Sequence, residues 1–223
     1  IKHSVGNKQS LINDQVNSII EDSEGDLWYG TNNGISLQDS KTGKWRSFLS
    51  TFENVQNSKN HIFTTLCYVW SGGYYNLKRI NVQTKDIRLY HGLHSVTAII
   101  EKDDKSMWIG TATGLFLLDI ESGKYERIQL PVESTYVYSL YQTKQGSLYI
   151  GTSGSGVLIY DPQTKLFTHY YTGNCAMISN NIYTILSDED NEILLSTENG
   201  LTSFYPKQKT FYNWTKEMGL MTT

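Results

Sequence analysis

Short runs of alternating apolar and polar residues recur along the whole chain, with turn-forming residues between them. In the first set these runs cover residues 16–20, 27–31, 35–38 and 45–48. A period of two is that of a half-buried β-strand, and Gly, Asn and Asp between such runs are typical of tight turns. Apolar patterns with helical spacing and caps are nearly absent. The pattern therefore predicts an all-β protein built from units of four short strands, here named a to d.

A four-residue marker recurs in strand b of each unit. It reads Trp-Tyr-Gly-Thr at residues 28–31 and returns in similar form at 70–73, 108–111 and 149–152. A more diverged copy lies at 194–197. The first positions of successive copies lie 42, 38, 41 and 45 residues apart. Periods of about 40–45 residues are those of four-stranded propeller blades. The chain is therefore predicted to be a β-propeller of four-stranded antiparallel blades.

The two ends of the sequence read as pieces of further blades. Residues 1–5 align with strand d of the fourth unit and are expected to be strand d of a preceding blade, while residues 215–223 resemble the lead-in to a next one. A closed five-blade ring has no obvious place for a spare strand, so we expect part of a larger, seven-blade type of ring. Alternatively, the spare strand displaces or supplements the outer strand of the last blade. The five complete blades are predicted at about residues 13–48, 60–90, 94–128, 135–170 and 179–214.

The second unit departs from the common register. Twelve residues separate the start of strand a from the marker in the other units, as from Val16 to Trp28, but only eight separate Ile62 from Trp70. Either this blade is naturally short or a mobile loop is missing from the sequence, and we favour the missing loop.

Composition supports the β class and argues against several functions. The chain has 16 Tyr, 5 Trp and 18 Gly but 3 Pro, and its net charge of −3 argues against a nucleic-acid partner. No run approaches the length of a membrane span, and the first residues lack the apolar run of a secretion signal. Cys67 and Cys175 have no metal-type spacing, so they pair only if the fold brings them together.

The repeats resemble the two-component regulator propeller repeats of hybrid two-component sensor proteins from gut Bacteroidetes. The resemblance lies in residues 16–22, 25–31 and 33–35 and returns in the third and fourth units, as in Gly-Ser-Leu-Tyr-Ile-Gly-Thr at 146–152. It covers essentially the whole chain. The fifth unit departs from the pattern at Leu194 and Ser196, which replace the aromatic residue and the glycine.

This resemblance implies a function that the spacing alone does not show. It implies a non-catalytic, periplasmic sensor segment of a membrane-anchored protein with a histidine kinase and a response regulator downstream. The ligand would be an oligosaccharide released from a glycan, either bound here or sensed elsewhere and relayed. The implied partners are other blades or domains of the same parent chain, with a homodimer left open.

Binding residues in a propeller are expected on the loops, because strands hold the shape. The b–c and d–a connections share one face of each blade, and Tyr74, Tyr75 and Asn76 break the repeat there with aromatic rings and an amide. These suit a sugar, which needs apolar ring faces and hydroxyl partners. The candidate ligand-binding residues are Tyr74, Tyr75, Asn76, Asn32, Asn33, Glu198 and Asn199. The marker aromatics are instead expected to pack between blades, with the marker glycine permitting a tight corner; this predicted core is Trp28, Trp70, Trp108 and Tyr149.

Other polar clusters have simpler interpretations. His91 and His94 lack a third metal ligand and are interpreted as surface residues, and no cofactor is expected. The acidic pairs, such as Asp103 and Asp104, lie in a–b turns, where solvated turn charges explain them better than a glycosidase pair. The alternatives to a sensor are a protein-interaction scaffold and, less favoured, a propeller lyase or glycosidase.

Overall fold

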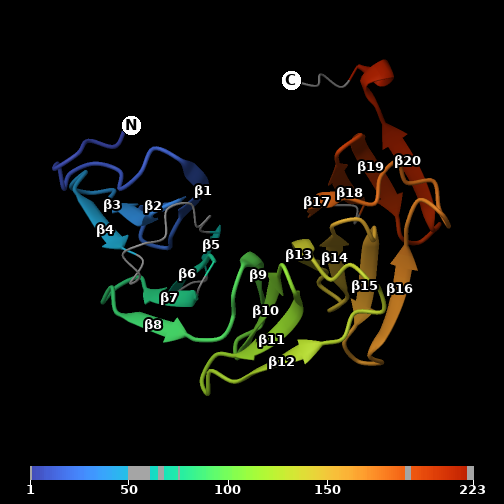
Figure 1. Cartoon of the computed structure of the whole chain (residues 1–223), viewed down its shortest axis with the longest axis horizontal. Coiled ribbons are helices and arrows are strands. Elements are labelled where there is room, and N and C mark those ends of the chain that lie inside the picture. Colours follow the sequence, from blue (N-terminus) through green and yellow to red (C-terminus); the bar gives the residue numbers. More distant parts are fainter. Residues whose placement is uncertain (1, 50–60, 65–67, 75, 189–191, 220–223) are drawn as a thin grey trace. The chain divides into compact units, whose positions relative to one another are not determined.

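The computed structural model describes residues 2–49, 61–64, 68–74, 76–188 and 192–219. Within these residues the strands form five four-stranded antiparallel sheets, and each sheet follows the chain order a–b–c–d (Figure 1). The chain divides into two compact units, Ile1–Ile99 and Ile100–Thr223. The all-β architecture and the four-stranded units predicted from the sequence are confirmed.

The first unit contains the first two sheets and the start of the third. The strands of the first sheet are β1 (Val16–Glu21), β2 (Leu27–Thr31), β3 (Gly34–Gln38) and β4 (Trp45–Leu49). Those of the second sheet are β5 (His61–Thr64), β6 (Tyr68–Gly72), β7 (Leu77–Asn81) and β8 (Ile87–Tyr90).

The third sheet begins at the end of the first unit, and the fourth and fifth lie in the second unit. The strands of the third sheet are β9 (Val96–Asp103), β10 (Ser106–Thr111), β11 (Gly114–Asp119) and β12 (Tyr125–Ile128). Those of the fourth are β13 (Val137–Gln142), β14 (Leu148–Thr152), β15 (Val157–Asp161) and β16 (Leu166–Tyr170). Those of the fifth are β17 (Ile182–Ser187), β18 (Ile193–Thr197), β19 (Gly200–Tyr205) and β20 (Thr210–Trp214), and a 3-10 turn, η1 (Lys216–Met218), follows.

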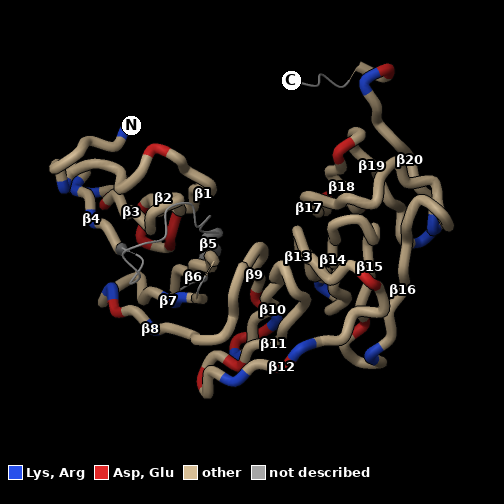
Figure 2. Tube along the Cα trace, in the orientation of Figure 1, with Lys and Arg blue, Asp and Glu red and all other residues tan. Residues whose placement is uncertain are grey.

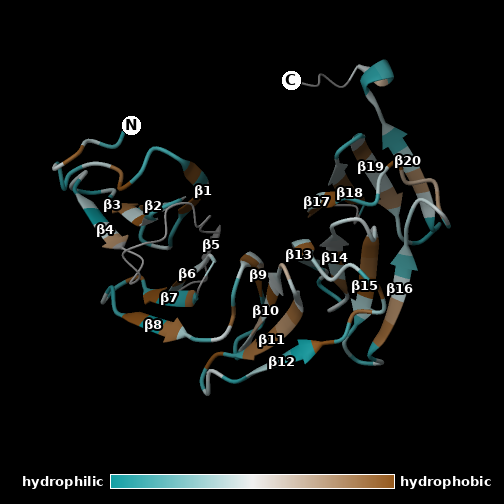
Figure 3. Ribbon diagram, in the orientation of Figure 1, coloured by the Kyte–Doolittle hydropathy of each residue, from teal (hydrophilic) through white to brown (hydrophobic). Residues whose placement is uncertain are grey.

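Apolar residues lie along the strands and polar residues lie between them. Figure 3 shows apolar colouring along β11 and β15, with hydrophilic turns at their ends. Lys and Arg are interspersed with Asp and Glu, many of them at turns (Figure 2). Most buried residues lie on the two middle strands of each sheet, and strand a adds others, such as Ile182 and Ile185 of β17.

The threonine of the marker closes the b–c turn. Thr31, Thr111, Thr152 and Thr197 donate from Oγ1 to a backbone carbonyl three or four residues on, at 2.7–3.0 Å. In three of these turns the acceptor glycine opens strand c with φ between 133° and 147°, a left-handed region that side chains rarely adopt. The side-chain bond and the glycine together explain why the turn sequence recurs.

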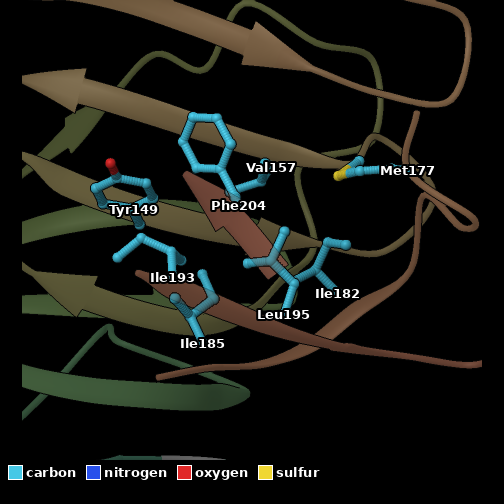
Figure 4. Close-up of a cluster of buried hydrophobic side chains, with 8 residues drawn as sticks. All are labelled: Tyr149, Val157, Met177, Ile182, Ile185, Ile193, Leu195 and Phe204. Atoms are coloured by element: carbon cyan, nitrogen blue, oxygen red, sulfur yellow. The ribbon is translucent and has the colours of Figure 1, made fainter. Parts of the chain in front are cut away.

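The marker aromatics fill the space between neighbouring sheets. In the first unit Trp28, 0% exposed, lies in one cluster with Phe48 of its own sheet and with Val69 and Ile80 of the second sheet. In the second unit Tyr149 occupies the corresponding place, against Phe204 of the fifth sheet (Figure 4). Trp70 and Trp108 are each 1% exposed. The structure therefore buries all four residues of the expected core, and the core lies between sheets rather than inside one.

A hydrogen-bonded aspartate fixes the first of these indoles. Asp22 Oδ2 accepts a hydrogen bond from Trp28 Nε1, with 2.6 Å between the two atoms. Its Oδ1 accepts hydrogen bonds from the backbone N–H groups of Glu24 and Asp26. Asp26 in turn binds Lys85 of the second sheet at 3.4 Å, and Lys85 Nζ lies 5.2 Å from the Trp28 ring centroid. One buried carboxylate therefore holds the a–b turn, the marker tryptophan and, through Asp26, the neighbouring sheet.

The marker glycine has a different role from the expected tight corner. Gly72 and Gly151 lie inside strands and have no positive φ. A Cβ atom on Gly72 would come within 2.3 Å of Val96 Cγ1, and one on Gly151 within 2.7 Å of the Ile182 carbonyl oxygen. The glycine is needed because strand a of the next sheet passes directly over it. The turns instead use glycines at the start of strand c.

Several sequence predictions concern segments that the structure describes only in part. Residues 2–5 form no strand; His3 makes a single isolated parallel bridge to Leu11, so a strand d of a preceding blade stays a prediction. The a–b connection of the second sheet, with Cys67, lies outside the described residues. Cys175 is a free, half-buried thiol.

We expect Asp22→Ala to lower the free energy of unfolding of the first unit by about 2–4 kcal/mol, because a buried indole N–H and two backbone N–H groups lose their acceptor. Urea unfolding followed by tryptophan fluorescence measures this change. Asp104→Ala, an exposed aspartate of another a–b turn, is the control and should shift stability by less than about 0.5 kcal/mol. Equal effects of the two substitutions would contradict the assigned role of Asp22.

We expect Gly151→Ala to lower the free energy of unfolding by about 1–3 kcal/mol, because its methyl group has to displace the Ile182 backbone. Gly154→Asn is the matched control, since Gly154 has open space around it and asparagine tolerates its φ of 83°. Thermal and urea unfolding of both variants test the close approach, and a neutral Gly151→Ala would exclude it.

Candidate functional site

The b–c and d–a connections of each sheet lie at the same strand ends, because neighbouring strands are antiparallel. We call this end of each sheet the loop face and the opposite end, with the a–b and c–d turns, the turn face. The six predicted ligand-binding residues that the structure describes lie on loop-face connections.

In the first unit the predicted asparagines belong to a hydrogen-bonded cluster. Asn32 accepts a hydrogen bond from Asn17 at 2.9 Å and donates one to Gln15. Asn33 is half-buried beside it, and its backbone N–H donates to the Thr31 hydroxyl at 3.3 Å. The side-chain amide of Asn32 therefore helps to hold the segment that leads into strand a against the b–c turn.

The break in the second repeat exposes an aromatic ring. Tyr74 is 57% exposed, and its backbone carbonyl accepts a hydrogen bond from the Ser95 N–H at 2.9 Å. Asn76 is half-buried, and Tyr75 lies outside the described residues. The structure thus places the Tyr74 ring at the surface of the loop face.

In the second unit the predicted acidic and amide residues hold the last d–a connection. Glu198 accepts hydrogen bonds from the Ser179 hydroxyl and the Asn181 amide, both at 3.0 Å. Asn199 donates from Nδ2 to the Ile178 carbonyl at 3.1 Å. Both side chains are nonetheless exposed, so the same oxygens and amides also face solvent.

Sequence reasoning missed a row of three tyrosines on the loop face of the second unit. The ring centroids of Tyr136 and Tyr138 lie 4.8 Å apart, and those of Tyr138 and Tyr183 lie 5.2 Å apart. Tyr183 is 44% exposed, and the other two are half-buried. We call Tyr136, Tyr138 and Tyr183 the tyrosine row.

Irregular pairing at the start of the inner strand directs these rings away from the core. The ladder between β13 and β14 shifts register between Val137 and Ser139, and that between β17 and β18 shifts between Ile182 and Thr184. In each case the skipped residue is a tyrosine. Such a bulge leaves its residue unpaired in the ladder and changes the direction of its side chain. This accounts for the positions of the Tyr138 and Tyr183 rings.

Hydrogen bonds of the nearby connections fix the row in place. The Ser153 N–H donates to the Tyr136 carbonyl at 3.0 Å, and the Ser134 hydroxyl donates to the Ser153 carbonyl at 2.6 Å. Burial, with a smaller contribution from Tyr138, raises the pKa of Tyr136. That hydroxyl therefore stays protonated at neutral pH and can donate a hydrogen bond.

The tyrosine row and the Glu198 cluster lie on the same loop face of the fourth and fifth sheets. Asn181, which donates to Glu198, is two residues before Tyr183. The arrangement combines aromatic faces, a carboxylate and an amide, which is the set of groups that binds a hydroxylated ring. One signal in the sequence could have found the row: a tyrosine directly follows the first apolar residue of strand a in two successive units.

No group of three or more His, Cys, Asp or Glu in the described ranges could hold a metal ion, and His91 and His94 are both exposed. None of the helices among these residues has the length and apolar character needed to span a bilayer.

Comparison with known families identifies the repeat. The family model described as "Two component regulator propeller" matches residues 10–33 and 131–154. These segments contain the strand a–turn–strand b portions of the first and fourth sheets. Two segments of the chain therefore match two-component regulator propeller repeats. A comparison with curated protein sequences finds no match.

Solved structures with a similar fold include extracellular domains of two-component systems and an enzyme. The extracellular domain of a protein assigned as a hybrid two-component system of B. thetaiotaomicron matches with TM-score 0.79 and 22% identity, over 96% of this chain and 31% of that chain. A second such domain from the same organism matches with TM-score 0.75 and 18% identity, over 90% and 28%. Virginiamycin B lyase of Staphylococcus aureus matches with TM-score 0.75 and 14% identity, over 94% and 73%.

These likenesses establish the β-propeller fold of the chain. At 14–22% identity an extracellular domain of a two-component system and a lyase match almost equally well, so the fold does not choose between their functions. The chain spans about a third of the length of the matched extracellular domains.

We expect Glu198→Ala to loosen the d–a connection that leads into the fifth sheet, because Ser179 and Asn181 lose their acceptor. Hydrogen exchange at residues 178–181 should accelerate about fivefold or more, while exchange in β14 stays unchanged. Glu198→Gln keeps an acceptor oxygen and should have a smaller effect. Glu133→Ala, an exposed control, should leave this segment unchanged; equal exchange in all three variants would contradict the role of Glu198.

Proposed function

We propose that this chain is a non-catalytic segment of the periplasmic sensor region of a hybrid two-component regulator, in which ligand binding is relayed to a histidine kinase. Two matched regulator propeller segments support the class, as does the likeness in fold to extracellular domains of such systems. The tyrosine row is the single observation that carries the binding role. It is an aromatic surface at a face where connections, not strands, determine the residues.

The ligand class that suits this surface is a glycan-derived oligosaccharide. Pyranose rings present flat C–H faces, which pack on aromatic rings, and hydroxyls, which need amide and carboxylate partners. The rings of Tyr138 and Tyr183 are available at 5.2 Å centroid separation, and Glu198 and Asn199 are exposed on the same loop face. Binding would act by favouring one arrangement of the sensor region over another.

The proposal includes further blades in the parent protein. On the fourth sheet, the face with Tyr149 and Val157 is covered by the fifth sheet. The register places Leu186, Tyr212 and Trp214 on the equivalent face of the fifth sheet, and they are 58%, 45% and 43% exposed. An apolar sheet face of this kind needs a cover, and another blade of the same repeat supplies one.

The likeness to virginiamycin B lyase makes a propeller lyase or glycosidase the competing proposal, and an interaction scaffold the other. One observation against the enzyme is that Glu198, an exposed loop-face carboxylate of the second unit, binds Ser179 and Asn181. The acidic pair Asp103 and Asp104 lies on the turn face.

The proposal is tested by isothermal titration and thermal shift against oligosaccharides prepared from plant and host glycans. We expect one of them to bind, and the double variant Tyr138→Ser/Tyr183→Ser to bind it at least about tenfold more weakly, because two stacking surfaces are lost. Tyr125→Ser, an exposed tyrosine of β12, is the matched control and should bind normally.

Product analysis of the same mixtures separates the sensor from the enzyme. We expect the oligosaccharide to be recovered unchanged, whereas turnover would establish a lyase or glycosidase. Failure of every oligosaccharide to bind, or equal affinity in the double variant, would remove the sensing role of the tyrosine row and leave the scaffold.

A further inference from the structure

A cavity of about 630 Å³ lies on the turn face of the second unit, at the opposite strand ends from the tyrosine row. Its walls come from the a–b turn and strand b of the fourth sheet, and from the end of the a–b connection, the start of strand b and the c–d turn of the fifth. The lining includes Tyr149, Glu192, Ile193, Tyr205 and Lys207. A volume of this size lies in the range of small-molecule sites.

The cavity occurs at the sheet junction where the marker aromatic is a tyrosine instead of a tryptophan. In the first and third sheets the marker indole donates a hydrogen bond, from Trp28 to Asp22 at 2.6 Å and from Trp108 to Gln142 at 2.7 Å. Tyr149 has no hydrogen-bond partner for its hydroxyl among the described residues. Figure 4 shows this hydroxyl at the margin of the apolar cluster, pointing away from Leu195. The Tyr149 hydroxyl is therefore available to form a hydrogen bond with another group.

Burial keeps the Tyr149 hydroxyl protonated. It raises the pKa of Tyr149 to about 12, with smaller contributions from Tyr170 and Tyr141. The phenol is thus a neutral hydrogen-bond donor and acceptor at any physiological pH. Its ring, with Ile193, which is 1% exposed, gives the cavity an apolar floor.

Two opposite charges line the same cavity without pairing with each other. Burial, and to a smaller extent the Glu192 carboxylate, raises the pKa of Tyr205. Lys207 follows on the c–d turn. Neither Glu192 nor Lys207 takes part in an ion pair within the described part of the chain. A carboxylate and an ammonium group are therefore both available to a ligand.

We propose that this cavity is a second binding site, which takes a small zwitterion such as a free amino acid. The ligand's ammonium group would meet Glu192, its carboxylate would meet Lys207, and its side chain would pack on the ring of Tyr149. A ligand that brings both complementary charges compensates the desolvation of both protein groups, which an uncharged molecule does not. This inference does not depend on the proposed sensing of oligosaccharides.

The decisive variant is Tyr149→Trp, because it installs the residue that the repeat itself uses at this junction. The larger indole should occupy the cavity and abolish binding while the sheets remain folded, as thermal unfolding would show. The probes are L-serine, L-glutamine and L-phenylalanine, with maltose as an uncharged probe, measured by saturation-transfer NMR and isothermal titration. We expect at least one amino acid to bind and maltose not to compete with it.

Matched substitutions test the two charges. Glu192→Gln and Lys207→Met should each weaken amino-acid binding at least tenfold, whereas Lys209→Met, in the same turn but outside the cavity lining, should leave it unchanged. The double variant Tyr138→Ser/Tyr183→Ser should also leave it unchanged, which separates this site from the tyrosine row. The proposal is overturned if none of the three amino acids binds, if a folded Tyr149→Trp binds undiminished, or if maltose displaces the amino acid.

Discussion

The close packing of each sheet against the next is the constraint on which the rest of this protein depends. A four-stranded sheet has two faces, and one sheet cannot bury both. The marker meets this need with two devices. An aromatic ring fills the space between sheets, as Trp28 and Tyr149 do, and a glycine such as Gly151 lets strand a of the next sheet pass over strand b.

This packing also determines which polar partners the buried marker residues need. A buried indole N–H group costs free energy when it has no acceptor. Asp22 of the same sheet is the acceptor for Trp28, and Gln142 of the following sheet is the acceptor for Trp108, whereas Trp70 Nε1 has no partner among the described residues. Tyr149 changes the requirement, because a phenol can reach a cavity and remain neutral there. A single substitution at a structural position can thus convert a closed junction into an open one.

Binding surfaces arise where the repeat stops being regular. The tyrosine row depends on bulges at the start of strand a, and the Glu198 cluster depends on a d–a connection that the last repeat holds with its own side chains. Both lie on connections or at strand ends, where a residue can change without opening the core. The rigid sheets then fix the positions of these groups at little entropic cost to a ligand.

The sequence by itself determined the strands, the turns and the burial of Trp28, Trp70, Trp108 and Tyr149, because a local period of two and a repeat of about forty residues are written along the chain. It misjudged the marker glycine, whose neighbour Ile182 lies in the next sheet and thirty-one residues away. Only the tertiary structure brought Tyr136, Tyr138 and Tyr183 together, and only it showed the cavity beside Tyr149. The physical reason is that both depend on how one sheet lies against another, which no local pattern encodes.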